Sequence, residues 1–129
     1  MAHKLEHELG GLYDVAHGAG LAAVWGSWAR YVYEGCLPRF VRFALNVMGV
    51  TPGKDDRETA LRGIEAVESF YRKIDMPTCL EELGVHATDA ELIEMAHKCA
   101  VGVGGGKGSA RFLKEEDMLK IFRMAAGRE

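Results

Sequence analysis

The chain has 129 residues, of which 48% are hydrophobic and 27% charged, and its formal net charge is −3. One globular domain fits this size and composition. The weak negative charge argues against binding to nucleic acid or an anionic membrane. No apolar run reaches the roughly 20 residues that span a bilayer. The first residues also lack the apolar stretch of a signal peptide.

The first predicted element is a short helix over residues 2–9, which ends at the glycine pair 10–11. His3 and His7 are four residues apart, so they share one face of this helix and their rings can converge. Imidazole is the commonest neutral ligand of borderline divalent metals, although two ordinary polar residues are the commoner meaning of such a pair taken alone. The helix lies near the start of the chain, where short helices are least held, so we expect it to fray.

A second helix follows, with Asp14 as its candidate N-cap and His17 in its first turn. Apolar residues at helical spacing predict that it runs to about residue 34. Asp14 can serve either as this cap or as the group that orients His17, and we favour the cap. Gly18 and Gly20 have no Cβ, so they allow either a bound molecule or a neighbouring helix to approach the backbone closely.

Residues 38–48 form the third predicted helix, with Pro38 in its first turn and Gly49 at its end. Apolar residues lie on most sides of this segment, which predicts a central position covered by neighbouring helices. An amphipathic helix over 57–74 follows, and Pro77 stops it.

Two T-x-x-E capping boxes lie at residues 78–81 and 88–91. The first predicts a short helix that ends at Gly84, and the second predicts a helix over about 89–101. The last predicted helix covers about 115–126. No segment alternates apolar and polar residues with a period of two. The sequence therefore predicts a single, compact, all-α domain of six or seven helices over the whole chain.

Other groups that suggest chemistry are expected to have ordinary structural roles. The glycine-rich run 102–109 follows a predicted helix and lacks the P-loop spacing, so we expect a mobile connecting loop. His86 and His97 are isolated and are expected at the surface or at a helix cap. The three cysteines are widely spaced without a CxxC pair, which fits buried apolar roles in a reducing cytoplasm.

The run HKLEHELGGLYDVAHGAGLA at residues 3–22 resembles the metal-binding signature of the iron-containing alcohol dehydrogenases, and it is closest to their butanol dehydrogenase-like branch. The resemblance extends over essentially the whole chain and implies the helical C-terminal domain of these enzymes, a dehydroquinate synthase-like α domain. The further landmarks are Trp28-Ala29-Arg30-Tyr31, RFVRFALNVMGV at 39–50, Phe70-Tyr71 before Met76-Pro77, Glu82-Leu83-Gly84, and Glu116-Asp117 with Ile121-Phe122.

The resemblance also implies roles for the histidines and their neighbours. His3 and His17 correspond to two of the four metal ligands of the family. His7 corresponds to a histidine beside the metal and the nicotinamide, where it either relays the alcohol proton or positions the nicotinamide. Gly18 is a candidate contact of the cofactor, and Asp14 a candidate support for the ligands. The implied reaction interconverts alcohols and aldehydes, with Fe²⁺ polarising the alcohol and hydride passing to or from NAD or NADP.

Two parts of such an enzyme have no counterpart in this sequence. Nothing corresponds to the dinucleotide-binding domain, and no Asp is followed four residues later by a His, the pattern that supplies the other two ligands in the family. We therefore expect the C-terminal part of a larger enzyme, inactive on its own. Its incomplete metal shell is expected to be empty or to take up zinc or nickel. The alternative is a stand-alone helical module that binds or oligomerises without catalysis.

In the resembled enzymes, this domain buries an apolar face against the nucleotide domain. The isolated chain is therefore expected to cover that face by forming a homo-oligomer, and a dimer is the commonest form. The residues expected to be exposed there lie near the histidines and are Leu9, Leu12, Tyr13, Leu21 and Trp25.

Overall fold

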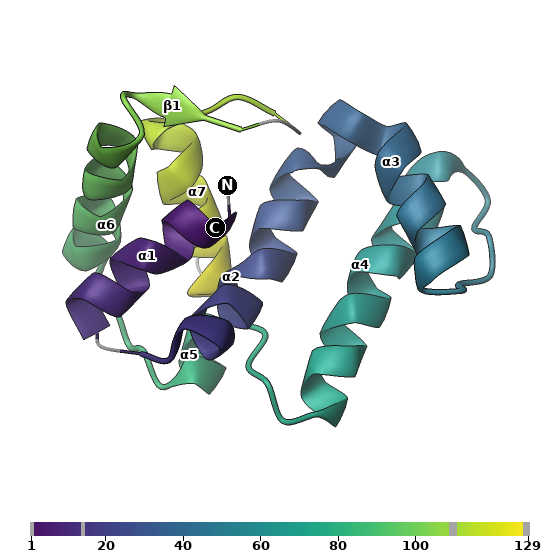
Figure 1. Cartoon of the computed structure of the whole chain (residues 1–129), viewed down its shortest axis with the longest axis horizontal. Helices are drawn as coiled ribbons and strands as arrows, with labels where there is room; N and C mark the ends of the chain where they lie inside the picture. The colour runs from purple at the N-terminus through teal and green to yellow at the C-terminus, as the bar shows by residue number, and fades with distance from the viewer. Residues whose placement is uncertain (1, 14, 109–110, 128–129) are drawn as a thin grey trace.

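The computed structural model describes residues 2–13, 15–108 and 111–127, and it confirms an all-α domain. Seven α-helices lie within these described residues, together with a 3₁₀ turn, a π turn and a pair of two-residue strands (Figure 1). None of the helices described is long and apolar enough to cross a membrane. In chain order the elements are α1 (Ala2–Tyr13), α2 (His17–Val32), η1 (Tyr33–Cys36), α3 (Leu37–Arg42), η2 (Phe43–Val47), α4 (Asp56–Lys73), α5 (Leu80–Leu83), α6 (Asp89–Gly102), β1 (Gly106–Lys107), β2 (Leu113–Lys114) and α7 (Glu115–Ala125).

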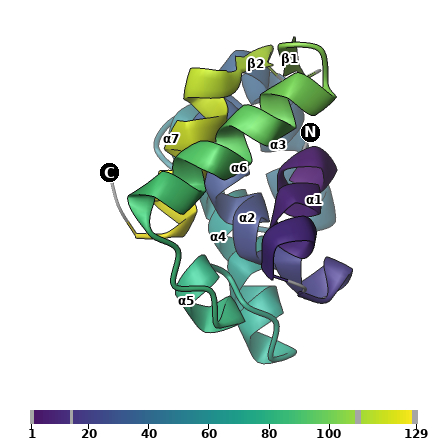
Figure 2. The same cartoon turned by 90° about the vertical axis from the view of Figure 1, so that its left-hand side faces the viewer.

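Helix α2 lies in the middle of the molecule and contacts α1, α4, α5 and α7. Helices α1, α6 and α7 lie on one side of it, and α3 and α4 lie on the other (Figure 1, Figure 2). The main core lies between α1, α2, α6 and α7, where Leu5, Val24, Met95 and Phe122 are at most 1% exposed. A smaller hydrophobic cluster joins α2 to α4. Helix α2 is therefore held between two packed groups of helices.

Helix α1 is longer and better anchored than the sequence predicts. It continues through Gly10 and Gly11 to Tyr13 and does not end at the glycine pair. Leu5 and Leu9 are fully buried in the main core, and α1 packs against α2 and α6. Beyond the glycine pair, Tyr13 packs partly buried against the main core, and such contacts oppose the cost of about 1 kcal/mol that each glycine adds inside a helix. The fraying expected of this helix stays a prediction, and the packing of α1 against α2 and α6 opposes it.

The segment 38–48 is not central, contrary to the prediction. It divides into α3 and η2, which lie at the edge of the molecule against α4 (Figure 1). Ala44 is the one buried residue of these two elements, whereas Leu45 is 37% and Val47 is 69% exposed. Ala44 packs against Gly63 of α4, where an added Cβ would lie 2.5 Å from the Ala44 Cβ. Close packing at this pair of small residues covers only one side of the segment and leaves its larger apolar side chains partly or fully exposed.

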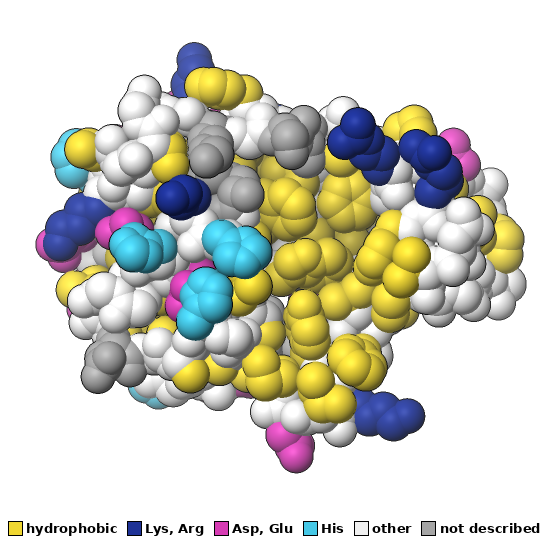
Figure 3. Space-filling model, in the orientation of Figure 1, with side chains coloured by type: hydrophobic (Ala, Val, Ile, Leu, Met, Phe, Trp, Pro, Cys, Tyr) yellow, Lys and Arg dark blue, Asp and Glu magenta, His cyan; other side chains and the backbone are white. Residues whose placement is uncertain are grey.

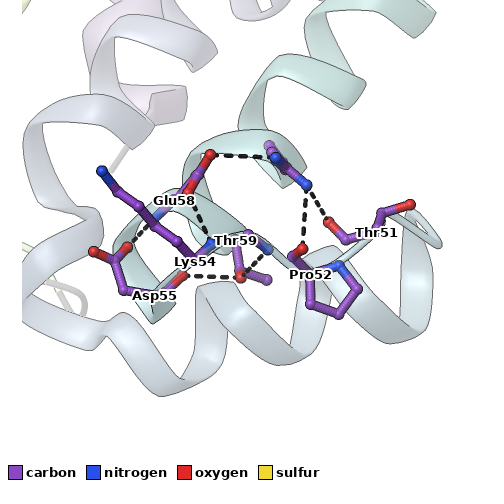
Figure 4. Close-up of polar contacts among 8 residues, drawn as sticks. Thr51, Pro52, Lys54, Asp55, Glu58 and Thr59 are labelled. Carbon is purple, nitrogen blue, oxygen red and sulfur yellow. Dashed lines mark hydrogen bonds and ion pairs between the residues drawn. The ribbon is translucent and has the colours of Figure 1, made fainter.

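The helix predicted over 57–74 is confirmed as α4, and hydrogen bonds hold the loop before it (Figure 4). The Asp55 carboxylate accepts from the backbone N–H of Glu58 at 2.8 Å and so caps the helix. The Glu58 carboxylate accepts in turn from the backbone N–H of Lys54 at 2.8 Å. One turn later, the Arg62 guanidinium donates to the carbonyl of Thr51 at 2.9 Å. These contacts fix the connection between η2 and α4.

One of the two predicted capping boxes is confirmed. Thr88 and Glu91 exchange both hydrogen bonds at the start of α6. The other box is wrong, because the backbone N–H and hydroxyl of Thr78 donate to Glu82, at 2.7 and 2.8 Å, and not to Glu81. Helix α5 has a single turn, and a side chain four residues from Thr78 reaches back over its start.

The glycine-rich run 102–109 has more structure than the predicted loop. Helix α6 continues through Gly102, and β1 pairs antiparallel with β2 to form a small hairpin. Leu113 of β2 is fully buried and anchors the hairpin on the main core. The end of the run, Ser109, lies outside the described residues.

The three cysteines are free, and only Cys99 has the buried role that was predicted. Cys99 lies in the main core, where burial raises the pKa of its thiol to about 11. Cys36 and Cys79 are partly exposed, because they precede the first turns of α3 and α5 near the surface.

Candidate metal and cofactor site

The three histidines that the sequence singles out lie at the start of the fold, on neighbouring helices. His3 and His7 are one turn apart on α1, and His17 is the first residue of α2. All three are exposed, and Figure 3 shows histidine side chains gathered on this face, beside acidic groups and a broad hydrophobic surface. The rings of His3 and His17 have centroids 5.5 Å apart and planes tilted by 36°. The fold therefore brings together the two histidines that the resemblance pairs.

A buried carboxylate contacts this pair. Glu6 is 3% exposed, and its Oε2 lies 2.5 Å from Nδ1 of His17. A carboxylate has only acceptors to offer, so Nδ1 carries the proton in this contact. Asp14, which the sequence offers either as the N-cap of α2 or as the group that orients His17, lies outside the described residues. Helix α2 begins at His17, and Ala16 precedes it without a side-chain cap.

The position of Glu6 in the helical pattern is a signal that sequence reasoning missed. The buried residues of α1 are Ala2, Leu5, Glu6 and Leu9, which have the i, i+3, i+4, i+7 spacing of one helix face. A glutamate is almost never fully buried unless it is paired. The apolar stripe therefore predicts a buried partner for Glu6, and the fold supplies His17.

The two glycines near the start of α2 have different surroundings. Gly20 is buried, and a Cβ at this position would lie 2.7 Å from Oε1 of Glu6, so the packing of Glu6 requires a glycine here. Of the two roles considered for Gly20, close packing between helices is the one that the structure shows. Gly18 is exposed, and an added Cβ would lie 3.9 Å from Met76, which is an ordinary contact.

An apolar surface adjoins the histidines, over α2, α3 and α4 (Figure 3). Its aromatic rings form a connected series. The ring centroid of Trp25 lies 6.5 Å from that of Trp28 and 6.4 Å from that of Tyr71. The ring centroid of Phe40, on α3, lies 6.4 Å from that of Trp28. A pocket of about 220 Å³ opens at this surface and is lined by Trp25, Cys36, Arg39, Phe40 and Phe43.

The residues predicted for the exposed apolar face are exposed only in part. Leu9 is fully buried, which contradicts the prediction, because α1 turns it into the main core. Leu12 is 39% exposed. Tyr13, Leu21 and Trp25 are half-buried. The apolar surface therefore depends more on α2, α3 and α4 than on α1.

Among the ranges 2–13, 15–108 and 111–127, no group of three or more His, Cys, Asp or Glu side chains is placed to hold a metal ion. His3 and His17 offer two donors. His86 and His97 are exposed, and His97 pairs with Glu115 at 3.0 Å, which agrees with the surface roles predicted for them.

The molecule is thus a helical domain in which two exposed histidines of neighbouring helices approach each other. Residues 1–126 match the model of the Fe-containing alcohol dehydrogenase family, C-terminal. The chain therefore belongs to the iron-containing alcohol dehydrogenase family, and the resemblance drawn from the sequence is confirmed.

Individual relatives match almost all of this chain. The NADH-dependent butanol dehydrogenase A of Clostridium acetobutylicum is 35% identical over 122 residues, which are 94% of this chain and 31% of that protein. The 1,3-propanediol dehydrogenase of Citrobacter freundii is 32% identical, over 95% of this chain and 31% of that protein. The crystal structure of the NADH-dependent butanol dehydrogenase A from Thermotoga maritima superposes with a TM-score of 0.85 at 32% identity, covering 97% of this chain and 32% of that chain. The chain thus spans just under a third of the length of these relatives.

Proposed function

We propose that this chain is the metal-binding part of an iron-dependent, NAD(P)-linked dehydrogenase that interconverts small alcohols and aldehydes. The proposal depends on the approach of His3 and His17, whose rings lie 5.5 Å apart within the segment that matches the family. Relatives named for butanol and 1,3-propanediol support the substrate class. Both NADH-dependent and NADPH-dependent relatives occur, so the choice of nucleotide stays open.

The histidine pair fits half of a metal shell. Two imidazole nitrogens on one tetrahedral ion lie about 2.1 Å from it, which places the two ring centroids roughly 5 Å apart. The observed separation of 5.5 Å is close to this value. The part of the chain that the structure describes offers no cluster of three donors, so the remaining ligands would come from the nucleotide-binding part of a longer protein.

Each residue of the site has a proposed role. When bound, Fe²⁺ supplies Lewis acidity that polarises the alcohol oxygen. His3 and His17 hold the ion. His7, exposed one turn from His3, either exchanges the alcohol proton with solvent or positions the nicotinamide. Gly18, exposed at the start of α2, leaves room for the cofactor. The free cysteines support the cytoplasmic location included in this proposal.

Metal titration of the chain tests the ligand set. We expect weak binding that follows the Irving–Williams order, with nickel, copper or zinc competing out Fe²⁺. His3→Ala or His17→Ala should each weaken Ni²⁺ binding at least about tenfold, because even the loss of a group that only supports a ligand costs 10–100-fold. Isothermal titration and metal analysis give the affinities.

The exposed His86 serves as the matched control, and His86→Ala should leave the Ni²⁺ affinity unchanged. Unchanged affinity in both His3→Ala and His17→Ala would mean that the ligands lie elsewhere and would overturn the proposal.

An activity assay with butanol and NAD or NADP tests the proposed reaction. Alcohol-dependent reduction of the nucleotide is expected only after mixing with the nucleotide-binding part, because this fold has no strand–glycine turn–helix unit among its described residues.

A second candidate function is a helical module that forms a homodimer without catalysis. The apolar surface over α2, α3 and α4 favours it, because Phe70 of α4 is 53% exposed and its ring centroid lies 6.5 Å from that of Tyr71. A nucleotide-binding domain or a second copy of the chain would each bury such a surface. Two-fold pairing is the commonest form of self-association.

Sedimentation of the chain at high micromolar concentration tests this association. We expect a dimer, and Phe70→Lys should shift it toward the monomer because the substitution places a charge on the apolar surface. Ile93→Lys is the control, since Ile93 is also exposed, at 44%, but lies on α6, which is not part of the apolar surface. A monomer at every concentration would exclude the dimer while leaving the metal proposal in place.

A further inference from the structure

We propose that Glu6 is a positioning residue of the metal site, which holds His17 through Nδ1 so that the ring presents Nε2 to the metal. The inference rests on the proposed function, because it takes His17 as a ligand. It adds a residue for which the sequence predicted no role.

The contact joins a buried group to an exposed one. Glu6 is 3% exposed, whereas the side chain of His17 is 63% exposed, and Oε2 of Glu6 lies 2.5 Å from Nδ1. The ring is therefore fixed at the nitrogen that faces the protein, and its remaining edge stays open. In the described ranges, the other buried carboxylates have different partners: Glu68 accepts from Arg30, and Asp117 accepts from Tyr31. Among these three carboxylates, Glu6 is the one that is hydrogen-bonded to a histidine.

The backbone of α2 is shaped to admit this carboxylate. An added Cβ at Gly20 would lie 2.7 Å from Oε1 and 2.8 Å from Cγ of Glu6. An added Cβ at Gly10, one turn after Glu6 on α1, would lie 3.6 Å from Oε1. Glu6 thus occupies the space that a side chain at position 20 would fill, and the two helices close around it. Because this glycine lies one turn after His17, the same turn of α2 both presents the histidine and accommodates its partner.

The chemistry of imidazole explains why this contact would matter. A neutral histidine can carry its proton on either nitrogen, and only the bare nitrogen binds a metal. A carboxylate that accepts from Nδ1–H keeps the lone pair on Nε2, fixes the ring orientation and raises the basicity of the ligand. Removing such a partner typically costs 10–100-fold in metal affinity. Nδ1 donates a single hydrogen bond, and in this proposal Glu6 accepts it.

The test combines nitrogen-15 NMR of the metal-free chain with Ni²⁺ titration. In the wild-type chain at alkaline pH, we expect the His17 proton on Nδ1 and a bare Nε2. Glu6→Gln keeps the volume but adds an amide donor, so it should move the proton to Nε2 and weaken Ni²⁺ binding by about 10–100-fold. Glu115→Gln is the matched control, because it changes the carboxylate whose Oε1 lies 3.0 Å from Nδ1 of the exposed His97. It should alter neither the position of the His17 proton nor the Ni²⁺ affinity.

The outcomes separate this inference from the proposed function. A proton on Nε2 of His17 in the wild-type chain would overturn the inference without any variant. Unchanged Ni²⁺ affinity in Glu6→Gln, with affinity lost in His17→Ala, would also overturn it and leave the proposed function standing. Unchanged affinity in His17→Ala would overturn the inference, and unchanged affinity in His3→Ala as well would also overturn the proposed function.

Discussion

Replacing Arg30 by alanine should lower the free energy of unfolding by about 2–3 kcal/mol, because it leaves the Glu68 carboxylate buried without its cation. Glu68 of α4 is 5% exposed and accepts a hydrogen bond from the Arg30 guanidinium of α2. This hydrogen bond raises the pKa of Arg30. The side chain of Arg30 is itself 38% exposed, so water replaces part of what is lost, and the effect should fall below the roughly 3–5 kcal/mol of a fully buried pair.

The comparison variant is Arg57→Ala. Arg57 pairs with Glu34 at 2.9 Å, but their side chains are 62% and 60% exposed, so its loss should cost less than about 1 kcal/mol. Urea denaturation of both variants gives the two free energies. Equal losses would show that burial of Glu68 does not control the effect. The double variant Arg30→Met with Glu68→Leu should recover most of the stability, since a buried ion pair can be replaced by apolar residues at little cost.

Local signals in the sequence were enough to predict most of the helices. The box of Thr88 and Glu91 marks the start of α6, and Gly84, with φ +89°, ends α5 where it was predicted. Such signals act within one turn of chain, where hydrogen bonds to the first or last backbone groups are decided by neighbouring residues. Local signals do not predict a helix end that depends on packing. The glycine pair 10–11 indicates an end to α1, but the helix continues to Tyr13.

The place of a helix in the fold was harder to predict than its existence. Residues 38–48 are apolar on most sides, and the pattern gives no sign that Ala44 against Gly63 would be their main buried contact. Hydrophobic periodicity indicates which faces of a helix could be buried, but it does not specify which neighbouring elements bury them. Val47 and Leu45 are apolar and yet exposed, because none of the elements that the structure describes covers them.

The candidate site was predictable to a similar extent. The four-residue spacing of His3 and His7 follows from helix geometry, and the resemblance pairs His3 with His17. The approach of those two rings depends on how α1 crosses α2, which no local pattern specifies. Glu6 was missed because a glutamate between two histidines reads as a polar surface residue, although its position beside Leu5 and Leu9 places it on the buried stripe.

Leu9→Ala should lower the free energy of unfolding by about 3 kcal/mol, within the 2–5 kcal/mol found for leucine truncations in cores. Leu9 is fully buried, and with Leu5 it anchors α1 on the main core. The same helix carries His3 and Glu6, so a loosened α1 should also lose hydrogen-exchange protection and separate His3 from His17. The effect would therefore reach the candidate site although Leu9 contacts no ligand.

Leu12→Ala provides the matched comparison on the same helix. Leu12 is 39% exposed, so its truncation leaves little cavity and should cost less than about 1 kcal/mol. Both variants remove the same atoms and change helix propensity by the same amount, so the difference between them measures the docking of α1 alone. Denaturation gives the free energies, and hydrogen exchange of the α1 amides shows whether the helix opens locally or with the whole domain. If Leu9→Ala costs no more than Leu12→Ala, α1 is not held in the core. In that case the geometry of His3, Glu6 and His17 would not be a property of the isolated chain.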